Sequence, residues 1–162
     1  KFKILKNGMS IIDLGAAPGS WSQFVISKFK NSKLVSIDLK KMKKIEKTFQ
    51  IEGDFNDEKH QRKIIDYFGE KIDLVMSDMA VNTTGNKNID SLVTGELSME
   101  ALNFATKMIK KDGSFISKIF MGTTFNEIVA SAKKYFKEVN VFKPPASRKE
   151  SKESFIICKN LR

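Results

Sequence analysis

Four acidic residues follow apolar stretches of the chain, at positions that suit ligand binding. Asp13, Asp38, Asp54 and Asp78 each come at or just after the end of an expected strand, and open α/β sheets bind ligands beyond the carboxyl ends of their strands. Asp38 lies 19 residues after Gly19, near the spacing of about 20 residues at which an acid binds ribose hydroxyls. We therefore expect Asp38 to hold a ribose and Asp54 to contact an adenine amino group. For each acid alone, the alternative is a turn or a helix cap.

The segment that begins at Asp13 reads Asp-Leu-Gly-Ala-Ala-Pro-Gly-Ser-Trp, a turn of small residues between an apolar strand and a helix. Small residues let the backbone approach a ligand closely, and a helix N-terminus favours electron-rich groups. Ala17 stands where a dinucleotide-binding fingerprint needs its second glycine, and the Gly-Lys-Ser/Thr of a P-loop is absent. The first departure, together with a lysine in the fifth strand, counts against a nicotinamide-dependent oxidoreductase.

That lysine, Lys118, is a basic residue between Ser117 and Ile119 in an otherwise apolar strand. A buried lysine is unfavourable unless it is paired, and Asp78, at the end of the preceding strand, is a candidate partner. Two interpretations remain open at this stage. Lys118 is either an edge residue whose amine reaches water or an amine that acts on a hydroxyl group beside a carboxylate.

A basic segment, residues 144–153, comes just before the last expected strand. Arg148, Lys149 and Lys152 are candidates for phosphate contacts, and Glu153 closes the segment; a solvated hairpin loop is the alternative. The whole chain has a net charge of +10, from 29 Lys+Arg against 19 Asp+Glu. This balance favours a polyanionic partner such as RNA, although a generally lysine-rich surface would also produce it.

The other reactive side chains do not form a familiar site. His60, the only histidine, is expected at the surface in the first turn of a helix, and the sequence offers no metal cluster and no Ser/His/Asp triad. Cys158 is expected to fill space near the last strand, and a single cysteine favours a reducing compartment. No apolar stretch approaches the roughly 20 residues of a membrane span, so no membrane partner is expected.

Alternating strands and helices must position these side chains. We expect strands over residues 9–14, 34–38, 49–51, 72–76, 114–120, 139–142 and 155–158, and helices over 20–30, after Asp57, over 97–109 and after Thr124. Segments 40–47 and 81–94 are expected to lack helices, and Thr124 with Glu127 predicts a capping box. The fold class is α/β, a doubly wound, mostly parallel seven-stranded sheet with a C-terminal antiparallel hairpin. One domain spanning residues 1–162 is expected.

Taken in order, these stretches resemble the FtsJ-type (RrmJ-type) ribosomal RNA ribose 2′-O-methyltransferases, which use S-adenosylmethionine (SAM) and have a Rossmann-like fold. The matching stretches are Asp13-Leu-Gly-Ala-Ala-Pro-Gly-Ser-Trp-Ser-Gln23, Asp38-Leu39, Gly53-Asp54-Phe55, Met76-Ser-Asp-Met-Ala80, Gly113-Ser-Phe-Ile-Ser-Lys118 and Ser147-Arg148 through Glu153. They span essentially the whole chain, and their order makes the resemblance specific.

The resemblance implies a Lys-Asp-Lys-Glu tetrad whose last three members are Asp78, Lys118 and Glu153. Lys118 would orient a ribose 2′-hydroxyl and accept its proton, while Asp78 and Glu153 position the amine. The resemblance also implies that S-adenosylhomocysteine is the product and that no metal is needed. The implied cofactor-binding residues are Gly15, Gly19, Trp21, Asp38, Asp54, Phe55 and Asp78.

The implied substrate is large-subunit (23S-type) ribosomal RNA, free or in an assembled large subunit, with a uridine of the A loop as the target. Arg148, Lys149 and Lys152 would bind this RNA. Two alternatives remain: a tRNA or cap 2′-O-methyltransferase of the same family, and a non-catalytic RNA-binding factor in ribosome assembly. A monomer in the cytoplasm is expected, with a mitochondrion or another organelle as the alternative compartment.

The chain departs from the family pattern in three places. The first lysine of the tetrad lies in a helix upstream of the first strand, and Lys1, Lys3 and Lys6 are too close to that strand to be this residue. Because the chain begins with Lys1 and not with methionine, we expect the natural N-terminal helix to be missing. Val81 replaces a proline and Ser20 replaces a glycine, and both changes are mild.

Overall fold

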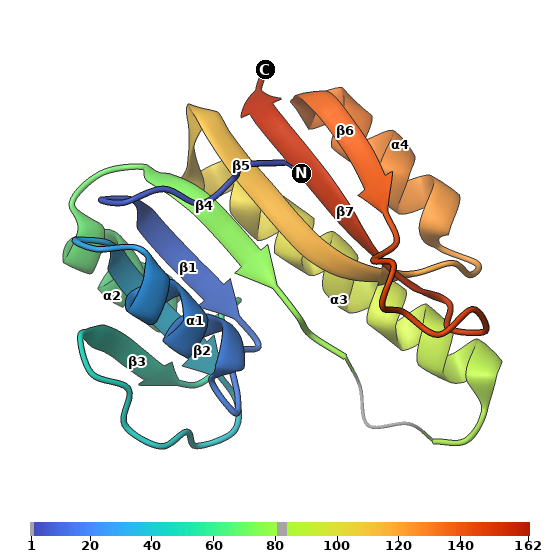
Figure 1. Ribbon diagram of the computed structural model, residues 1–162, viewed down its shortest axis with the longest axis horizontal. Coiled ribbons are helices and arrows are strands. Elements are labelled where there is room, and N and C mark those ends of the chain that lie inside the picture. Colours follow the sequence, from blue (N-terminus) through green and yellow to red (C-terminus); the bar gives the residue numbers. More distant parts are fainter. Residues whose placement is uncertain (1, 81–83) are drawn as a thin grey trace.

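A computed structural model describes residues 2–80 and 84–162 of the chain, so Lys1 and Val81 lie outside the described residues. The described residues form one mixed sheet with helices on both faces (Figure 1). The strands are β1 (Ser10–Leu14), β2 (Lys33–Asp38), β3 (Thr48–Glu52), β4 (Ile72–Ser77), β5 (Ile109–Phe120), β6 (Phe136–Phe142) and β7 (Glu153–Leu161). The helices are α1 (Ser20–Lys28), α2 (Glu58–Phe68), α3 (Lys87–Met108) and α4 (Phe125–Tyr135).

The strand order is β3-β2-β1-β4-β5-β7-β6. The pairs β1–β2, β2–β3, β1–β4 and β4–β5 are parallel, whereas β7 pairs antiparallel with both β5 and β6. The doubly wound sheet and its C-terminal hairpin are therefore confirmed. The chain winds away from β1 toward β3 and then returns to the other side of β1 as β4, so a ligand crevice is expected where β1 and β4 end.

Side chains alternate between the two faces of the sheet and build two apolar layers. Ile12 and Leu14 of β1 belong to the larger layer, which packs against α2, α3 and α4. Ile11 belongs to the smaller layer, where Val25 of α1 covers the opposite face. In Figure 1, α1 lies in front of the sheet and α3 lies behind it. Cys158 is buried in β7, as expected.

The expected strands and helices are present, and residues 40–47 contain no helix, but the structure corrects some boundaries. The loop expected over 81–94 is wrong from residue 87 onward, because α3 begins there. The Asn86 side chain caps this helix by accepting hydrogen bonds from the backbone N–H groups of Asn88 and Ile89. Strand β5 also begins earlier than expected, at Ile109.

The capping box expected at Thr124 is wrong in its hydrogen bond, although Thr124 does precede α4. Its backbone has φ −94° and ψ −1°, in the helical region, and within the described residues its side chain makes no capping hydrogen bond. Capping residues normally have extended backbone angles. The Thr124 side chain packs against Gly95 of α3 instead, where a Cβ atom would collide with it. Among the described residues, no helix has the length and apolar character needed to cross a membrane.

Candidate active site

The turn after β1 brings backbone close to the end of β4. Gly15 has φ +66°, and a Cβ atom at this position would collide with the Met79 side chain. The backbone N–H groups of Gly15 and Ala16 both donate to the carbonyl oxygen of Ile37, at 2.9 and 3.2 Å. Gly19 has φ +117°, and a Cβ atom there would lie 2.7 Å from Cδ1 of Ile45. Glycine is therefore required at both ends of this turn.

Asp38, the last residue of β2, is held by backbone groups of neighbouring loops. Its Oδ2 accepts a hydrogen bond from the N–H of Ala17 at 3.0 Å, and its Oδ1 accepts one from the N–H of Lys40 at 2.7 Å. The N–H of Gly53 donates to the Asp38 carbonyl oxygen at 2.8 Å. Each carboxylate oxygen keeps a further lone pair, so Asp38 can still accept hydrogen bonds from two hydroxyl groups of a ligand.

His60 holds the backbone of Asp54 in place. The expectation that this histidine lies at the surface is wrong. His60 is only 7% exposed, and its Nδ1 lies 2.9 Å from the carbonyl oxygen of Asp54. The imidazole fills the space beside Gly53, where a Cβ atom would collide with the ring. The carboxylate of Asp54 accepts a hydrogen bond from the N–H of Asn56 at 2.8 Å. Gly53, which precedes α2 in the chain, thus leaves the space that the histidine ring fills.

These loops surround a hollow of about 460 Å³ at the carboxyl ends of the parallel strands. Of the residues implied by the resemblance, it is lined by Gly15, Asp38, Asp54, Phe55 and Asp78. The wall opposite the strands comes from α3, and sequence reasoning missed its three contributors. They are Val93, Leu97 and Glu100, whose helical spacing was the available signal.

Lys118 lies at the side of this hollow, between two carboxylates. Its Nζ is 2.7 Å from Oδ1 of Asp78 and 3.8 Å from Oε1 of Glu153. The Lys118 side chain is only 17% exposed, against 35% for Asp78 and 44% for Glu153. Strand β5 lies inside the sheet between β4 and β7, so the interpretation of Lys118 as an edge residue is wrong. Asp78 lines the hollow and contacts the amine, so it connects the two.

Asp13 does not face the hollow, unlike the other three acids at strand ends. It is 1% exposed beneath α1, and its Oδ2 accepts a hydrogen bond from the Ser22 hydroxyl at 2.6 Å. The Ser22 hydroxyl also lies 2.6 Å from that of Ser36. Burial raises the pKa of the Asp13 carboxyl to about 7; the charges of Asp78 and Asp38 add to this effect, and the Ser22 hydrogen bond opposes it.

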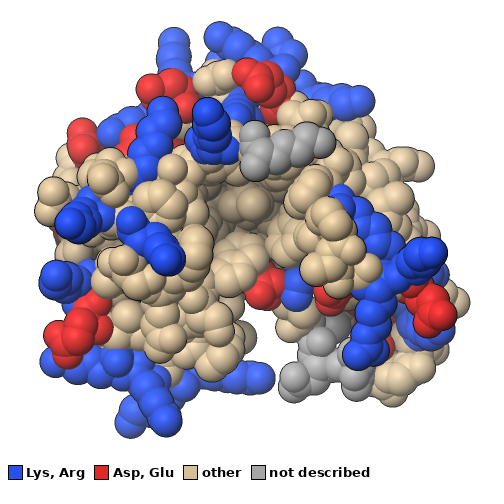
Figure 2. Space-filling view, viewed as in Figure 1, with Lys and Arg blue, Asp and Glu red and all other residues tan. Residues whose placement is uncertain are grey.

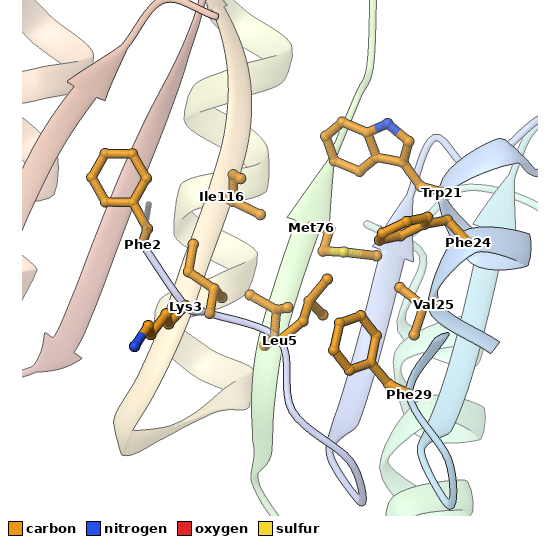
Figure 3. Close-up of a pocket in the computed structure, with 11 residues that line it drawn as sticks. Phe2, Lys3, Leu5, Trp21, Phe24, Val25, Phe29, Met76 and Ile116 are labelled. Carbon is orange, nitrogen blue, oxygen red and sulfur yellow. The ribbon is translucent and has the colours of Figure 1, made fainter. Parts of the chain in front are cut away.

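Gly19 and Trp21 are not among the residues that line this hollow. Trp21 lines a separate hollow of about 650 Å³ between the N-terminal segment, α1 and the sheet. Figure 3 shows Trp21 and Phe24 facing this space together with Met76 of β4 and Ile116 of β5. Among the described residues that line it, Lys3 is the only charged one, so those residues offer no pair of groups for proton transfer. The cofactor role of Trp21 stays a prediction.

Arg148, Lys149 and Lys152 are exposed on the connection between β6 and β7, which leads directly into Glu153. The Lys143 amine ties this connection together by donating to the carbonyl oxygens of Lys149 and Ser151 at 3.3 and 2.6 Å. The three basic side chains therefore stand in water beside the Lys118 site. Within the described residues, no cluster of three or more His, Cys, Asp or Glu side chains is arranged to hold a metal ion.

Comparisons with known proteins agree with this geometry. The family model for FtsJ-like methyltransferases matches residues 1–161. A protein of Pelagibacter ubique named ribosomal RNA large subunit methyltransferase E is 65% identical over 162 residues, which are 100% of this chain and 80% of that protein. A protein of the same name from Zymomonas mobilis is 43% identical and is covered to 73%. A crystal structure from Plasmodium falciparum, described as a ribosomal RNA methyltransferase, matches with a TM-score of 0.85 at 30% identity, over 98% of this chain and 88% of that one.

Proposed function

The chain belongs to the FtsJ-like methyltransferase family, and from this premise we propose that it transfers a methyl group from SAM to a ribose 2′-hydroxyl of large-subunit ribosomal RNA. The observation that carries this proposal is the Lys118 amine held between Asp78 and Glu153 at the side of the hollow. We also propose that residues 1–162 act as one methyltransferase domain, since a single sheet carries both the hollow and the amine.

The residues around the hollow fit SAM. The two oxygens of Asp38 can accept hydrogen bonds from the ribose hydroxyls, and the Asp54 carboxylate can accept one from the adenine amino group. Gly15 lets the backbone approach the ligand, Phe55 adds apolar surface, and Asp78 lies on the side toward Lys118. Gly19 and Trp21 are also assigned to the cofactor, on the resemblance alone.

The proposed reaction is an in-line displacement. SAM, when bound, supplies an electrophilic methyl carbon, and S-adenosylhomocysteine remains once the carbon–sulfur bond has broken with its electron pair on sulfur. Lys118, as the neutral amine, orients the 2′-hydroxyl and takes its proton as the ribose oxygen forms its new bond to carbon. Asp78 and Glu153 hold the amine in place, and this alignment supplies much of the rate enhancement.

Large-subunit ribosomal RNA is proposed as the substrate because the named relatives are large-subunit ribosomal RNA methyltransferases. The exposed Arg148, Lys149 and Lys152 would contact its phosphates next to Glu153. A uridine of the A loop is the proposed target nucleotide, on the family resemblance. The net charge of +10 suits such a partner.

The decisive experiment compares two lysines of the same strand. Full-length protein is incubated with methyl-labelled SAM and large ribosomal subunits from cells that lack the gene. The test variant is Lys118→Met. The control variant is Lys110→Met, which removes a lysine of β5 that is also paired, with Asp73 at 3.2 Å and Glu70 at 3.8 Å, but lies far from the hollow.

We expect label on RNA ribose from the wild type and the Lys110 variant, and a loss of about 100-fold or more in the Lys118 variant, because a positioned base contributes about that much. SAM binding, measured by calorimetry, should stay within about twofold, since the catalytic effect is separate from ground-state binding. Normal transfer by the Lys118 variant would contradict the mechanism. Absence of transfer by a wild type that binds SAM would contradict the proposed function.

A further inference from the structure

The connection between β2 and β3 carries an unusual concentration of positive charge. Residues 40–47, here called the lysine segment, contain Lys40, Lys41, Lys43, Lys44 and Lys47 against a single acid, Glu46. All five lysines are exposed. The segment therefore holds a net charge of +4 out of +10 for the whole chain. The ion pair recorded within it joins Lys44 and Glu46 at 3.6 Å, with both side chains 82% exposed, so water screens this interaction strongly.

The backbone of the lysine segment has a defined shape even though its lysines stand in water. The Gln50 side chain accepts a hydrogen bond from the N–H of Ile45 and donates one to the carbonyl oxygen of Lys43, both at 2.9 Å. The Ile45 side chain is buried and reaches Gly19 at the start of α1. Because the backbone of such a segment is already ordered, little conformational entropy is lost when it binds a ligand, which favours binding.

The lysine segment lies on the opposite side of the hollow from the connection between β6 and β7. It begins at Lys40, which lines the hollow, and the N–H of Lys40 donates to Asp38. The other connection ends at Glu153, beside Lys118. Figure 2 shows Lys and Arg side chains at the lower left, over the connection between β2 and β3, and on the right, over the connection between β6 and β7. The two basic segments thus flank the hollow and the amine.

We propose that the lysine segment is a second RNA-binding arm, which contacts the sugar–phosphate backbone of the substrate on the cofactor side of the site. This inference rests on the proposed function. Ammonium groups on a fixed backbone bind phosphates without reading sequence. One arm on each side of the hollow would hold the RNA strand across the Lys118 amine, and each phosphate contact would release a counterion.

The test compares two triple variants that remove the same charge. The test variant changes Lys41, Lys43 and Lys44 to Gln and leaves Lys40, which lines the hollow. The control variant changes Lys133, Lys134 and Lys137 to Gln. These three lysines are also exposed. They lie where α4 ends and β6 begins, at the end of the sheet where the parallel strands start, away from their carboxyl ends. Binding of full-length protein to a fluorescent large-subunit ribosomal RNA fragment is measured across a salt series, and SAM binding is measured by calorimetry.

We expect the test variant to bind RNA about tenfold more weakly than the control at moderate salt, with the slope of log K against log salt reduced by about 2, since each lost phosphate contact removes about 0.7 to 0.9 of slope. SAM affinity should match that of the control. Equal RNA binding by the two triple variants would overturn the inference but would not contradict the proposed methyl transfer. RNA binding that depends on the lysine segment, without methyl transfer by the wild type, would instead contradict the proposed function alone. The inference would also be overturned if the wild type bound anionic phospholipid vesicles but not RNA, and if the test variant no longer bound the vesicles.

Discussion

Replacement of Asp13 by Asn should change how the stability of this protein depends on pH. The carboxyl is buried between β1, β2 and α1, and its pKa is raised from the ordinary 3.8 to about 7, chiefly by burial. Between these two values the folded protein keeps a proton that the unfolded chain has released. The folded state then binds more protons than the unfolded state, so stability falls as pH rises through this window.

The size of the effect follows from the two pKa values. Each unit of pKa difference corresponds to 1.36 kcal/mol, so a rise from 3.8 to about 7 corresponds to about 4 kcal/mol of unfolding free energy lost between pH 4 and pH 7.5. Asn has no proton to lose and removes this contribution. It still offers an oxygen to the Ser22 hydroxyl, which donates to Asp13 at 2.6 Å. Any cost of the amide itself is the same at every pH.

The assay is urea unfolding of the wild type and Asp13→Asn at pH values from 4 to 8.5. We expect the wild type minus variant difference in unfolding free energy to fall by about 4 kcal/mol toward high pH and then to level off. Asp66→Asn, at an exposed position of α2, makes the same chemical change in water and serves as the control. A flat difference for Asp13, or the same slope for both variants, would refute the argument that burial holds a proton on this carboxyl.

Two further substitutions test the loops that shape the hollow. His60→Ala should weaken SAM binding by about threefold to tenfold and lower the unfolding free energy by about 1–3 kcal/mol, because it opens a cavity beside Gly53 and leaves the Asp54 carbonyl oxygen only the hydrogen bond from the N–H of Asp57, at 3.2 Å. Calorimetry and urea unfolding measure both effects, and an unchanged SAM affinity would show that His60 does not position Asp54. Gly15→Ala should abolish measurable SAM binding and lower the unfolding free energy by about 1–3 kcal/mol, because the new Cβ collides with Met79 at a positive φ. A variant that binds SAM as the wild type does would contradict the argument that the backbone at Gly15 must approach the ligand closely.

The local features of the site were predictable from the sequence, because neighbouring residues produce them. The turn from Asp13 to Gly19 joins an apolar strand to a helix, and its small residues indicate a turn whose backbone can approach a ligand closely. The acids at the end of β2 and just after β4 were predictable for the same reason, since apolar runs mark strand ends. The lysine at position 118 was conspicuous because it interrupts such a run.

Burial of polar residues was not predictable, because it depends on partners distant in the sequence. The first residues of α3 read as a polar loop, yet Thr94 is buried. Ser98, one turn later in the predicted helix, is buried as well, and its hydroxyl donates to the carbonyl oxygens of Thr94 and Lys118 at 3.0 and 3.1 Å. Because a carbonyl oxygen of β5 satisfies this hydroxyl, a polar residue of α3 can be buried against the sheet. His60 is a different case, because its neighbour Gly53 is close in the sequence, and the turn between β3 and α2 brings the ring into the space that this glycine leaves.

The sequence by itself determined which residue types stand at the ends of the strands, because strands, turns and caps follow from near neighbours. Only the tertiary structure decided which of these side chains meet. Alternation along β1 turns Asp13 under α1, and the insertion of β7 between β5 and β6 places Lys118 inside the sheet with Glu153 beside it. Strand order is set by how the whole sheet buries its two faces, and no local pattern contains that information.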